Sequence, residues 1–259
     1  MPASRHRHAL LVLLLGLWAC IGPARAQAPA AIEQARQLVL VVSLDWNAPA
    51  GQLQTFEKKK GQWVAVREAF PVSLGRTGSA WGMGLHPPQK DGPLKAEGDG
   101  KSPAGIFAIG PAFGYAASRK TALPYLPMQA TSYCMDVPAS PLYNQIVDSA
   151  KVGDAAVQGS TEPMRLDLRS AGDIRYREGF VIAHNASAVP GRGSCIFAHL
   201  RRAPGEATAG CTSMEAANMD QLLDWLKPAR KPVFVLLPRD EYMRLQGPWH
   251  LPELPGAHG

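Results

Sequence analysis

The sequence predicts a mainly β fold (α+β), a curved β-sandwich or partly closed barrel with one or two helices. Short apolar or alternating runs, which are typical of strands, outnumber the segments with helical spacing. The 259-residue chain contains 25 glycines and 23 prolines, and many of them separate these runs at short intervals. Short strands joined by turns, with few helices, indicate a sheet-based domain.

The predicted strands follow one another along most of the chain. Residues 38–44 form a continuous apolar run, as expected for a buried strand. Residues 53–56 and 63–66 flank a Lys-Lys-Lys-Gly tip and predict a hairpin. A loop rich in Pro and Gly over residues 86–105 precedes a strand at 106–109. The last strands are expected at residues 180–184, 194–199 and 233–237.

One helix is predicted near the C-terminal end of the chain. Thr212-x-x-Glu215 has the form of a capping box, and Pro228 ends the pattern that follows it. Between these limits, apolar side chains recur at helical spacing: Met219, Leu222, Leu223 and Leu226. Residues 123–172, by contrast, are rich in Pro, Tyr and Ser and are expected to be irregular.

The chain divides into three parts. Residues 1–26 have the basic start, apolar run and Ala24-Arg25-Ala26 site of a secretory signal peptide, so export to the periplasm or cell-wall space is expected. The apolar run is too short to remain as a stable membrane span. Lipid attachment at Cys20 is a competing interpretation of the same segment. Residues 36–240 are expected to form one domain, and residues 241–259 a C-terminal tail.

Charge and motifs exclude several classes of function. The formal net charge of +6 falls to +3 without the three arginines of the signal, and no basic stripe interleaved with aromatic residues indicates nucleic acid as a partner. The histidines lack metal-ligand spacing, and no nucleotide-binding loop or Gly-x-Ser-x-Gly motif occurs. We therefore expect a monomer that needs neither a metal nor a cofactor.

Cys211 and His199 form the candidate catalytic pair. An apolar run ends in His199, and the turn Thr208-Ala-Gly-Cys211 begins nine residues later. His199, oriented by a backbone carbonyl, can act as base for the thiol, and the predicted helix at Thr212 would lower the pKa of that thiol. The N–H groups of Gly210 and Cys211 would hold an oxyanion. The alternative is a buried cysteine beside a histidine whose hydrogen bonds are satisfied in the core.

Three cysteines remain once the signal peptide is removed, namely Cys134, Cys195 and Cys211. An odd number of cysteines in an exported protein leaves at least one thiol unpaired, and three pairings are possible. Only a disulfide between Cys134 and Cys195 leaves Cys211 free to act as the nucleophile. A disulfide through Cys211 would rule out catalysis, and the sequence leaves both outcomes open.

Several short motifs occur in one order along the chain: Leu74-Gly-Arg-x-Gly78, Gly98-Asp-Gly-Lys-Ser-Pro-Ala-Gly-Ile-Phe107, Ala183-His184-Asn185, Gly193-Ser-x-Ile-Phe-x-His199 and Thr208-Ala-Gly-Cys211. Together they resemble the short-motif branch of the L,D-transpeptidase catalytic domain (YkuD-type) family, over about residues 71–240. The resemblance implies the fold of that family and its chemistry. A cysteine attacks the third-residue carbonyl of a peptidoglycan tetrapeptide stem, expels the terminal D-alanine and passes the acyl group to an amine. Peptidoglycan stem peptides are then the expected partners.

The sequence departs from the better-studied branch of that family near the nucleophile. Ala209 stands where that branch has a second histidine, and Ser213 stands where it has an arginine. Binding of the stem-peptide carboxylate must therefore come from elsewhere, and the candidates are Arg76, Arg165, Arg192, Arg201 and Arg202. Substrate contacts are expected from His184, Asn185, Thr208 and Ser194. For His184, a place in the core is an equal alternative.

The resemblance leaves three functions open. An exported cysteine peptidoglycan L,D-transpeptidase is the leading one. The same site acting as a hydrolase (a carboxypeptidase or amidase, with water as acceptor) is the first alternative. A non-catalytic cell-wall-binding module is the second. A papain-like protease does not fit, because that family places its cysteine early and its histidine far downstream.

Overall fold

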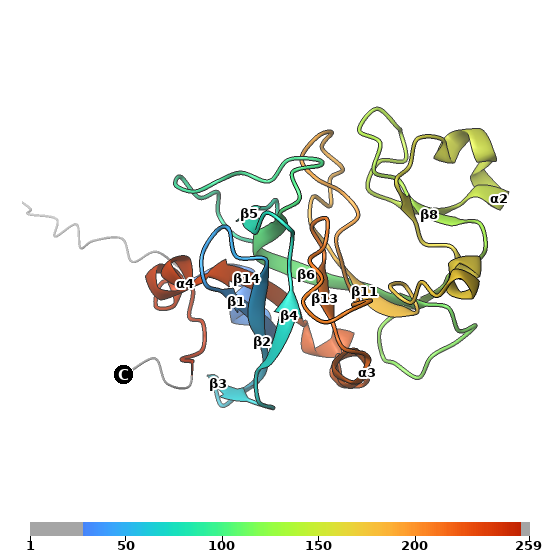
Figure 1. Ribbon diagram of the computed structural model, residues 1–259. Helices are drawn as coiled ribbons and strands as arrows, with labels where there is room; N and C mark the ends of the chain where they lie inside the picture. Colours follow the sequence, from blue (N-terminus) through green and yellow to red (C-terminus); the bar gives the residue numbers. More distant parts are fainter. Residues whose placement is uncertain (1–27, 255–259) are drawn as a thin grey trace, which may run out of the picture.

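A closed circuit of eight strands forms the centre of the computed structural model, which describes residues 28–254 (Figure 1). Around the circuit the order is β1 (Gln37–Ser43), β14 (Val233–Pro238), β6 (Ser102–Gly114), β11 (Glu178–Ile182), β12 (Phe197–Leu200), β13 (Thr212–Met214), β4 (Phe70–Ser73) and β2 (Ala50–Lys59). Pairing of β2 with β1 closes it. The predicted mainly β fold is confirmed, and the barrel closes fully. The predicted signal peptide, with Cys20, lies outside the described residues.

Three strands extend this sheet, and a smaller sheet lies beside it. The additional strands are β3 (Gln62–Ala65), β5 (Ser79–Trp81) and β7 (Tyr125–Pro127). The smaller sheet has the order β10 (Glu162–Pro163), β8 (Ser132–Cys134) and β9 (Ile146–Asp148), so the stretch expected to be irregular contains a sheet of its own. In Figure 1 this part, with β8 and α2, stands to one side of the barrel.

The helices are short and lie in the segments before, between and after the barrel strands. The α-helices are α1 (Ala30–Gln34), α2 (Ser149–Val152), α3 (Ala216–Trp225) and α4 (Arg239–Leu245). Three 3₁₀ helices are η1 (Asp154–Val157), η2 (Leu166–Ala171) and η3 (Pro228–Arg230). α3 is the helix that the apolar spacing predicted, and its buried side chains are Met219, Leu222 and Leu223.

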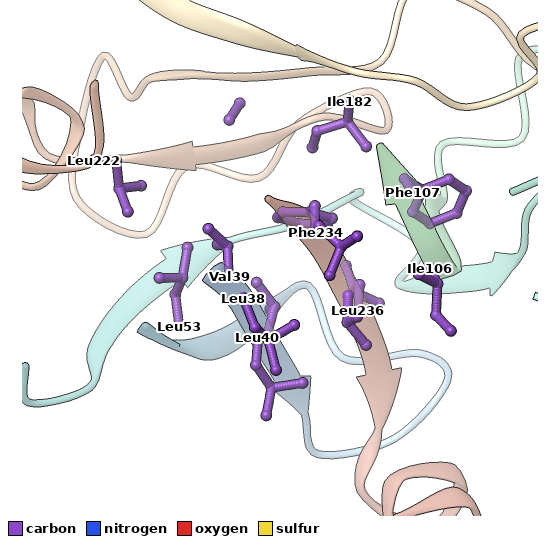
Figure 2. Packing of buried hydrophobic residues seen from close by; sticks show 14 of the residues in the cluster. Leu38, Val39, Leu40, Leu53, Ile106, Phe107, Ile182, Leu222, Phe234 and Leu236 are labelled. Atoms are coloured by element: carbon purple, nitrogen blue, oxygen red, sulfur yellow. The ribbon is translucent and has the colours of Figure 1, made fainter. Parts of the chain in front are cut away.

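The apolar runs become strands because both of their faces are covered. Leu38 and Leu40 of β1 and Phe234 and Leu236 of β14 belong to one buried cluster (Figure 2). β1 pairs in parallel with β14, as expected for strands that read as continuous apolar runs. Each fully buried side chain of this kind contributes roughly 1.5–3 kcal/mol to folding. Burial of these two strands therefore contributes to the stability of the barrel.

Two strand boundaries differ from the sequence prediction for local reasons. The strand expected at 106–109 is the middle of β6, which spans 13 residues and pairs with both β14 and β11. The strand expected at 194–199 starts only at Phe197, because Cys195 has a φ of +55°. A cysteine in the left-handed region cannot continue a strand.

The prediction of a helix that begins at Thr212 is wrong. Residues Thr212–Met214 form β13, which pairs in parallel with β12 and meets Ser73 of β4. α3 begins only at Ala216, and the side chain of Glu215 forms no capping hydrogen bond. Pairing of β13 with both β12 and β4 outweighs the local helix propensity of these residues, which is a weak preference. Cys211 consequently precedes a strand.

The segment expected to be a tail packs on the barrel as far as residue 254. Tyr242 and Leu245 of α4 are buried, and so is Trp249 after the helix. The Trp63 indole donates a hydrogen bond of 3.0 Å to the carbonyl of His250. The apolar side chains of this segment therefore belong to the buried core of the barrel.

Candidate active site

Cys211 directly precedes β13, and its side chain lies in the same buried cluster as Cys134 of β8 and Cys195. Parallel pairing sets Ala198 opposite Thr212 and His199 opposite Ser213. The backbone N–H of Phe197 donates to Cys211 Sγ over 3.3 Å, and the thiol donates to the carbonyl of Cys195 over 3.5 Å. The short segment that leads into β12 therefore holds the sulfur with both hydrogen bonds.

His199 is held in one tautomer by the backbone. Its Nδ1 lies 2.8 Å from the carbonyl oxygen of Leu200, which can only accept a hydrogen bond, so Nδ1 carries the proton. The edge of the Tyr176 ring packs on the imidazole, with ring centroids 5.8 Å apart. The backbone partner that the sequence predicted for His199 is thus Leu200. The free Nε2 remains available to accept a proton.

Two cavities meet at Cys211. A cavity of about 200 Å³ is lined by Cys211 and His199, together with Thr208, Glu162 and four arginines. A larger cavity of about 520 Å³ is lined by Cys211 and Gly210, together with Ser194, Glu97 and Lys95. Cys211 lines both cavities. A group bound in either one can therefore reach the same sulfur.

Both members of the candidate pair are neutral at physiological pH. Burial, with a further contribution from the charge of Glu162, raises the pKa of the Cys211 thiol to about 12. Burial lowers the pKa of His199 to about 4. The expected lowering of the thiol pKa by a helix terminus is wrong, because β13 follows Cys211 and α3 begins at Ala216. A thiolate must therefore form by proton transfer during the reaction.

The turn before Cys211 is fixed by Thr208. Its hydroxyl donates to the carbonyl of Cys211 over 2.7 Å and accepts from the N–H of Gly210 over 3.1 Å. Ser102 also donates to the Cys211 carbonyl, over 3.0 Å. Gly210 has a φ of +155°, and a Cβ there would lie 2.9 Å from the carbonyl oxygen of Lys101. The predicted oxyanion donor at Gly210 is thus engaged by Thr208 in this structure.

His184 and Asn185 lie away from both cavities. Nδ1 of His184 accepts from the N–H of Met83 over 3.2 Å, and Nε2 donates to the carbonyl of Arg192 over 2.9 Å. The Asn185 amide donates to the carbonyls of Val189 and Gly193, over 3.0 and 2.9 Å. His184 is therefore buried with both ring nitrogens hydrogen-bonded, and the side chains of His184 and Asn185 shape the loop that leads to Cys195.

Ser194 lies on the wall of the larger cavity. Its hydroxyl donates to the carboxylate of Glu97 over 2.7 Å, and Tyr143 donates to the same oxygen. The sequence-predicted residues Cys211, Gly210 and Ser194 are thus gathered around one space, with Thr208 and His199 around the adjoining one.

Cys134 and Cys195 form a disulfide with a Cα–Cα distance of 5.9 Å. Of the three cysteines in the described part of the chain, Cys211 is the free thiol. This is the pairing on which a catalytic role for Cys211 depends. The disulfide also joins β8 of the small sheet to the residue whose carbonyl accepts the Cys211 thiol.

The structure separates the candidate arginines. Arg76 lines both cavities, and among the arginines that line them within residues 28–254 it is the one whose guanidinium forms no ion pair. Its backbone N–H donates to the carbonyl of Thr208 over 2.8 Å. Arg165 and Arg192 line neither cavity. Arg201 and Arg202 line the smaller cavity but are paired with Glu215 and Glu206.

Sequence reasoning missed two charged residues of the site. Arg175 lines the smaller cavity and binds Asp173 with an N–O distance of 2.6 Å. Glu162 lines both cavities and belongs to β10 of the small sheet. Neither carries a motif signal, because Glu162 lies in the stretch expected to be irregular and Arg175 lies in the turn before β11. Only the folded chain brings them to Cys211.

Comparison with known proteins gives one match. Residues 42–235 match the family described as the L,D-transpeptidase catalytic domain. No curated protein and no solved structure matches the chain. Within residues 28–254, no group of three or more His, Cys, Asp or Glu side chains is arranged to hold a metal ion. No helix in those residues is long and apolar enough to cross a membrane.

Proposed function

This chain belongs to the L,D-transpeptidase catalytic domain family, whose members act on peptidoglycan, and from that premise we propose that it is an exported cysteine L,D-transpeptidase. Cys211 is the nucleophile, His199 the general base, and peptidoglycan stem peptides are the substrates. The observation that carries the proposal is the cavity shared by a free thiol and a histidine whose Nε2 is left available. The N-terminal signal pattern of residues 1–26 supports export.

The first half of the proposed reaction acylates Cys211. As Cys211 Sγ attacks the third-residue carbonyl of a tetrapeptide stem, its proton passes to Nε2 of His199. The tetrahedral intermediate collapses, and the amine of the terminal D-alanine leaves with the proton that His199 returns. Because burial lowers the pKa of His199 to about 4, the imidazolium is a stronger acid than an exposed one and gives up this proton more readily.

The second half transfers the acyl group to an amine. The acceptor attacks the thioester carbonyl, and Cys211 is regenerated as the thiol when the second tetrahedral intermediate collapses. The negative oxygen of both intermediates needs backbone donors. Gly210 provides one once its N–H turns from Thr208 toward the substrate. The two cavities that meet at Cys211 support transfer over hydrolysis, because one can hold the acyl donor while the other admits an amine.

A muropeptide assay tests this function. The mature protein, incubated with a disaccharide-tetrapeptide, should release D-alanine and form dimers joined through the third-residue carbonyl, detected by mass spectrometry. Tripeptide monomers without dimers would instead identify a hydrolase that uses water as acceptor. Unchanged tetrapeptide would favour a wall-binding module, and retention of the protein on insoluble peptidoglycan would then be the activity to measure.

Arg76 is our candidate for binding the terminal carboxylate of the stem peptide. We expect Arg76→Gln to raise KM for the tetrapeptide by roughly 10- to 100-fold with kcat within a few-fold, because one charge-assisted hydrogen bond to a bound ion is lost. Initial rates with the free acid and with the C-terminally amidated tetrapeptide measure this. Arg165→Gln, which alters an exposed arginine outside both cavities, is the matched control. If the wild type has the same KM for the amidated tetrapeptide as for the free acid, Arg76 does not bind the terminal carboxylate.

A further inference from the structure

Glu162 faces the nucleophile from the small sheet. It belongs to β10 and lines both the cavity of about 200 Å³ and the cavity of about 520 Å³, as does Cys211. After burial, the charge of Glu162 has the largest influence on the pKa of the Cys211 thiol, and it raises that pKa. Because Glu162 and Cys211 line the same two cavities, a substrate bound to the sulfur would meet this carboxylate.

The Glu162 carboxylate has no partner within the described part of the chain. Arg175, whose charge acts on it, is bound to Asp173 with an N–O distance of 2.6 Å. Burial raises the pKa of Glu162 to about 7, although the residue as a whole is only half-buried. The group therefore changes between carboxylate and carboxylic acid near neutral pH. A partly buried carboxylate without a donor is suited to a cationic ligand.

The disulfide sets Glu162 in position relative to Cys211. Glu162 is paired with Cys134 across the ladder between β10 and β8, and Cys134 is bonded to Cys195. The carbonyl of Cys195 in turn accepts the hydrogen bond of the Cys211 thiol, over 3.5 Å. Ser160 adds a hydrogen bond of 2.8 Å to the carbonyl of Cys134. A short chain of bonded neighbours thus joins the carboxylate to the nucleophile.

Glu162 does not assist the first half of the reaction. Its charge opposes formation of the Cys211 thiolate, which carries the same sign. It would also repel the carboxylate of a leaving D-alanine. His199 already serves the proton transfers of acylation. A carboxylate beside the thioester can instead assist the second half of the reaction, the transfer of the acyl group. In that step the incoming amine arrives as a cation.

We propose that Glu162 is the acceptor-binding residue, which holds the ammonium group of the incoming amine in the cavities beside the Cys211 thioester. This rests on the transferase function proposed above. The carboxylate takes one proton from the ammonium, and the neutral amine then attacks the thioester carbonyl. The second proton on nitrogen passes to Nε2 of His199 and from there to Cys211 Sγ as the carbon–sulfur bond breaks. The product is an amide, a free thiol and a protonated Glu162, which returns its proton to solvent.

The test uses the mature, disulfide-bonded protein, a tetrapeptide donor and glycinamide as the acceptor. Glycinamide carries an amine and no carboxylate, so it isolates recognition of the cation. We expect Glu162→Gln to lower kcat/KM for glycinamide by roughly 10- to 100-fold, because a charge-assisted hydrogen bond is lost. Acylation of Cys211 by the donor alone, followed by intact mass, should keep at least the wild-type rate.

The pH profile gives a second readout. The Glu162 carboxyl is ionised above its pKa of about 7, so KM of the wild type for glycinamide should fall between pH 6 and 8. That dependence should vanish in Glu162→Gln and persist in Glu162→Asp. The matched control is Glu33→Gln, which removes a paired carboxylate outside both cavities.

Each outcome decides between the two proposals. If Glu162→Gln acylates normally and keeps the wild-type rate of transfer and the wild-type pH profile, the role of Glu162 is overturned. The proposed transferase function would still stand. Slower acylation in that variant would also overturn it, because the carboxylate would then serve the first step. Absence of any acyl adduct on wild-type Cys211 would overturn the transferase function itself. If Glu162→Gln does not keep the disulfide and a native unfolding midpoint, Glu162→Asp and the wild-type pH profile decide the question.

Discussion

Replacing Cys211 with serine should abolish transfer almost completely, by on the order of a thousandfold or more. The serine hydroxyl is a far weaker acid than a thiol, and His199, whose pKa burial lowers to about 4, is too weak a base to activate it. Release of D-alanine and formation of dimers measure the loss. A carbapenem, whose strained lactam carbonyl acylates thiolates, offers a second measurement, because the wild type should gain its mass and Cys211→Ser should not.

The structure supplies the control for this experiment. The Cys211 side chain is held by hydrogen bonds to Phe197 and Cys195 that a serine hydroxyl can also form, so the fold should be retained. The disulfide between Cys134 and Cys195 should stay intact in both proteins. A carbapenem adduct on Cys211→Ser would mean that the drug reacts elsewhere, and transfer by that variant would mean that Cys211 is not the nucleophile.

The fold could be predicted where apolar pattern alone decides the structure. The continuous apolar runs near residues 38–44 and 233–237 are strands because both faces are buried, and α3 follows its helical spacing. Thr212–Met214 could not be predicted, because a capping-box pattern is a local signal and strand pairing across the barrel is not. The small sheet also lacks a local signal, since its three strands contain eight residues in total.

The sequence could predict those residues of the site that lie close to one another along the chain. Cys211, His199 and the turn through Gly210 lie within 13 positions of one another, so their motifs are visible together. Glu162 reaches the same cavity from the small sheet and Arg175 from the turn before β11, and neither carries a motif. The chemical state of the pair was also out of reach, because burial sets the pKa of Cys211 and that of His199, and burial is a property of the folded chain.

Replacing His199 with alanine should slow acylation of Cys211 by roughly 100- to 10,000-fold, because the general base is lost. In the wild type, His199 is already neutral above its pKa of about 4, so the carbapenem acylation rate should be nearly constant from pH 6 to 8. In His199→Ala, only thiolate formed by loss of a proton to solvent can react. Because burial raises the pKa of Cys211 to about 12, the rate should then rise about tenfold for each pH unit.

This alkaline recovery separates a base from a residue that merely supports the fold. A variant whose site has collapsed would stay inactive at every pH, whereas loss of the base alone is overcome by hydroxide. His250→Ala is the control, because that histidine is exposed and paired with Glu33, away from both cavities. If His199→Ala reacts as fast as the wild type at pH 7, the thiol is activated by another group. If its rate stays low and flat up to pH 10, His199 acts through structure and the assignment of the base is wrong.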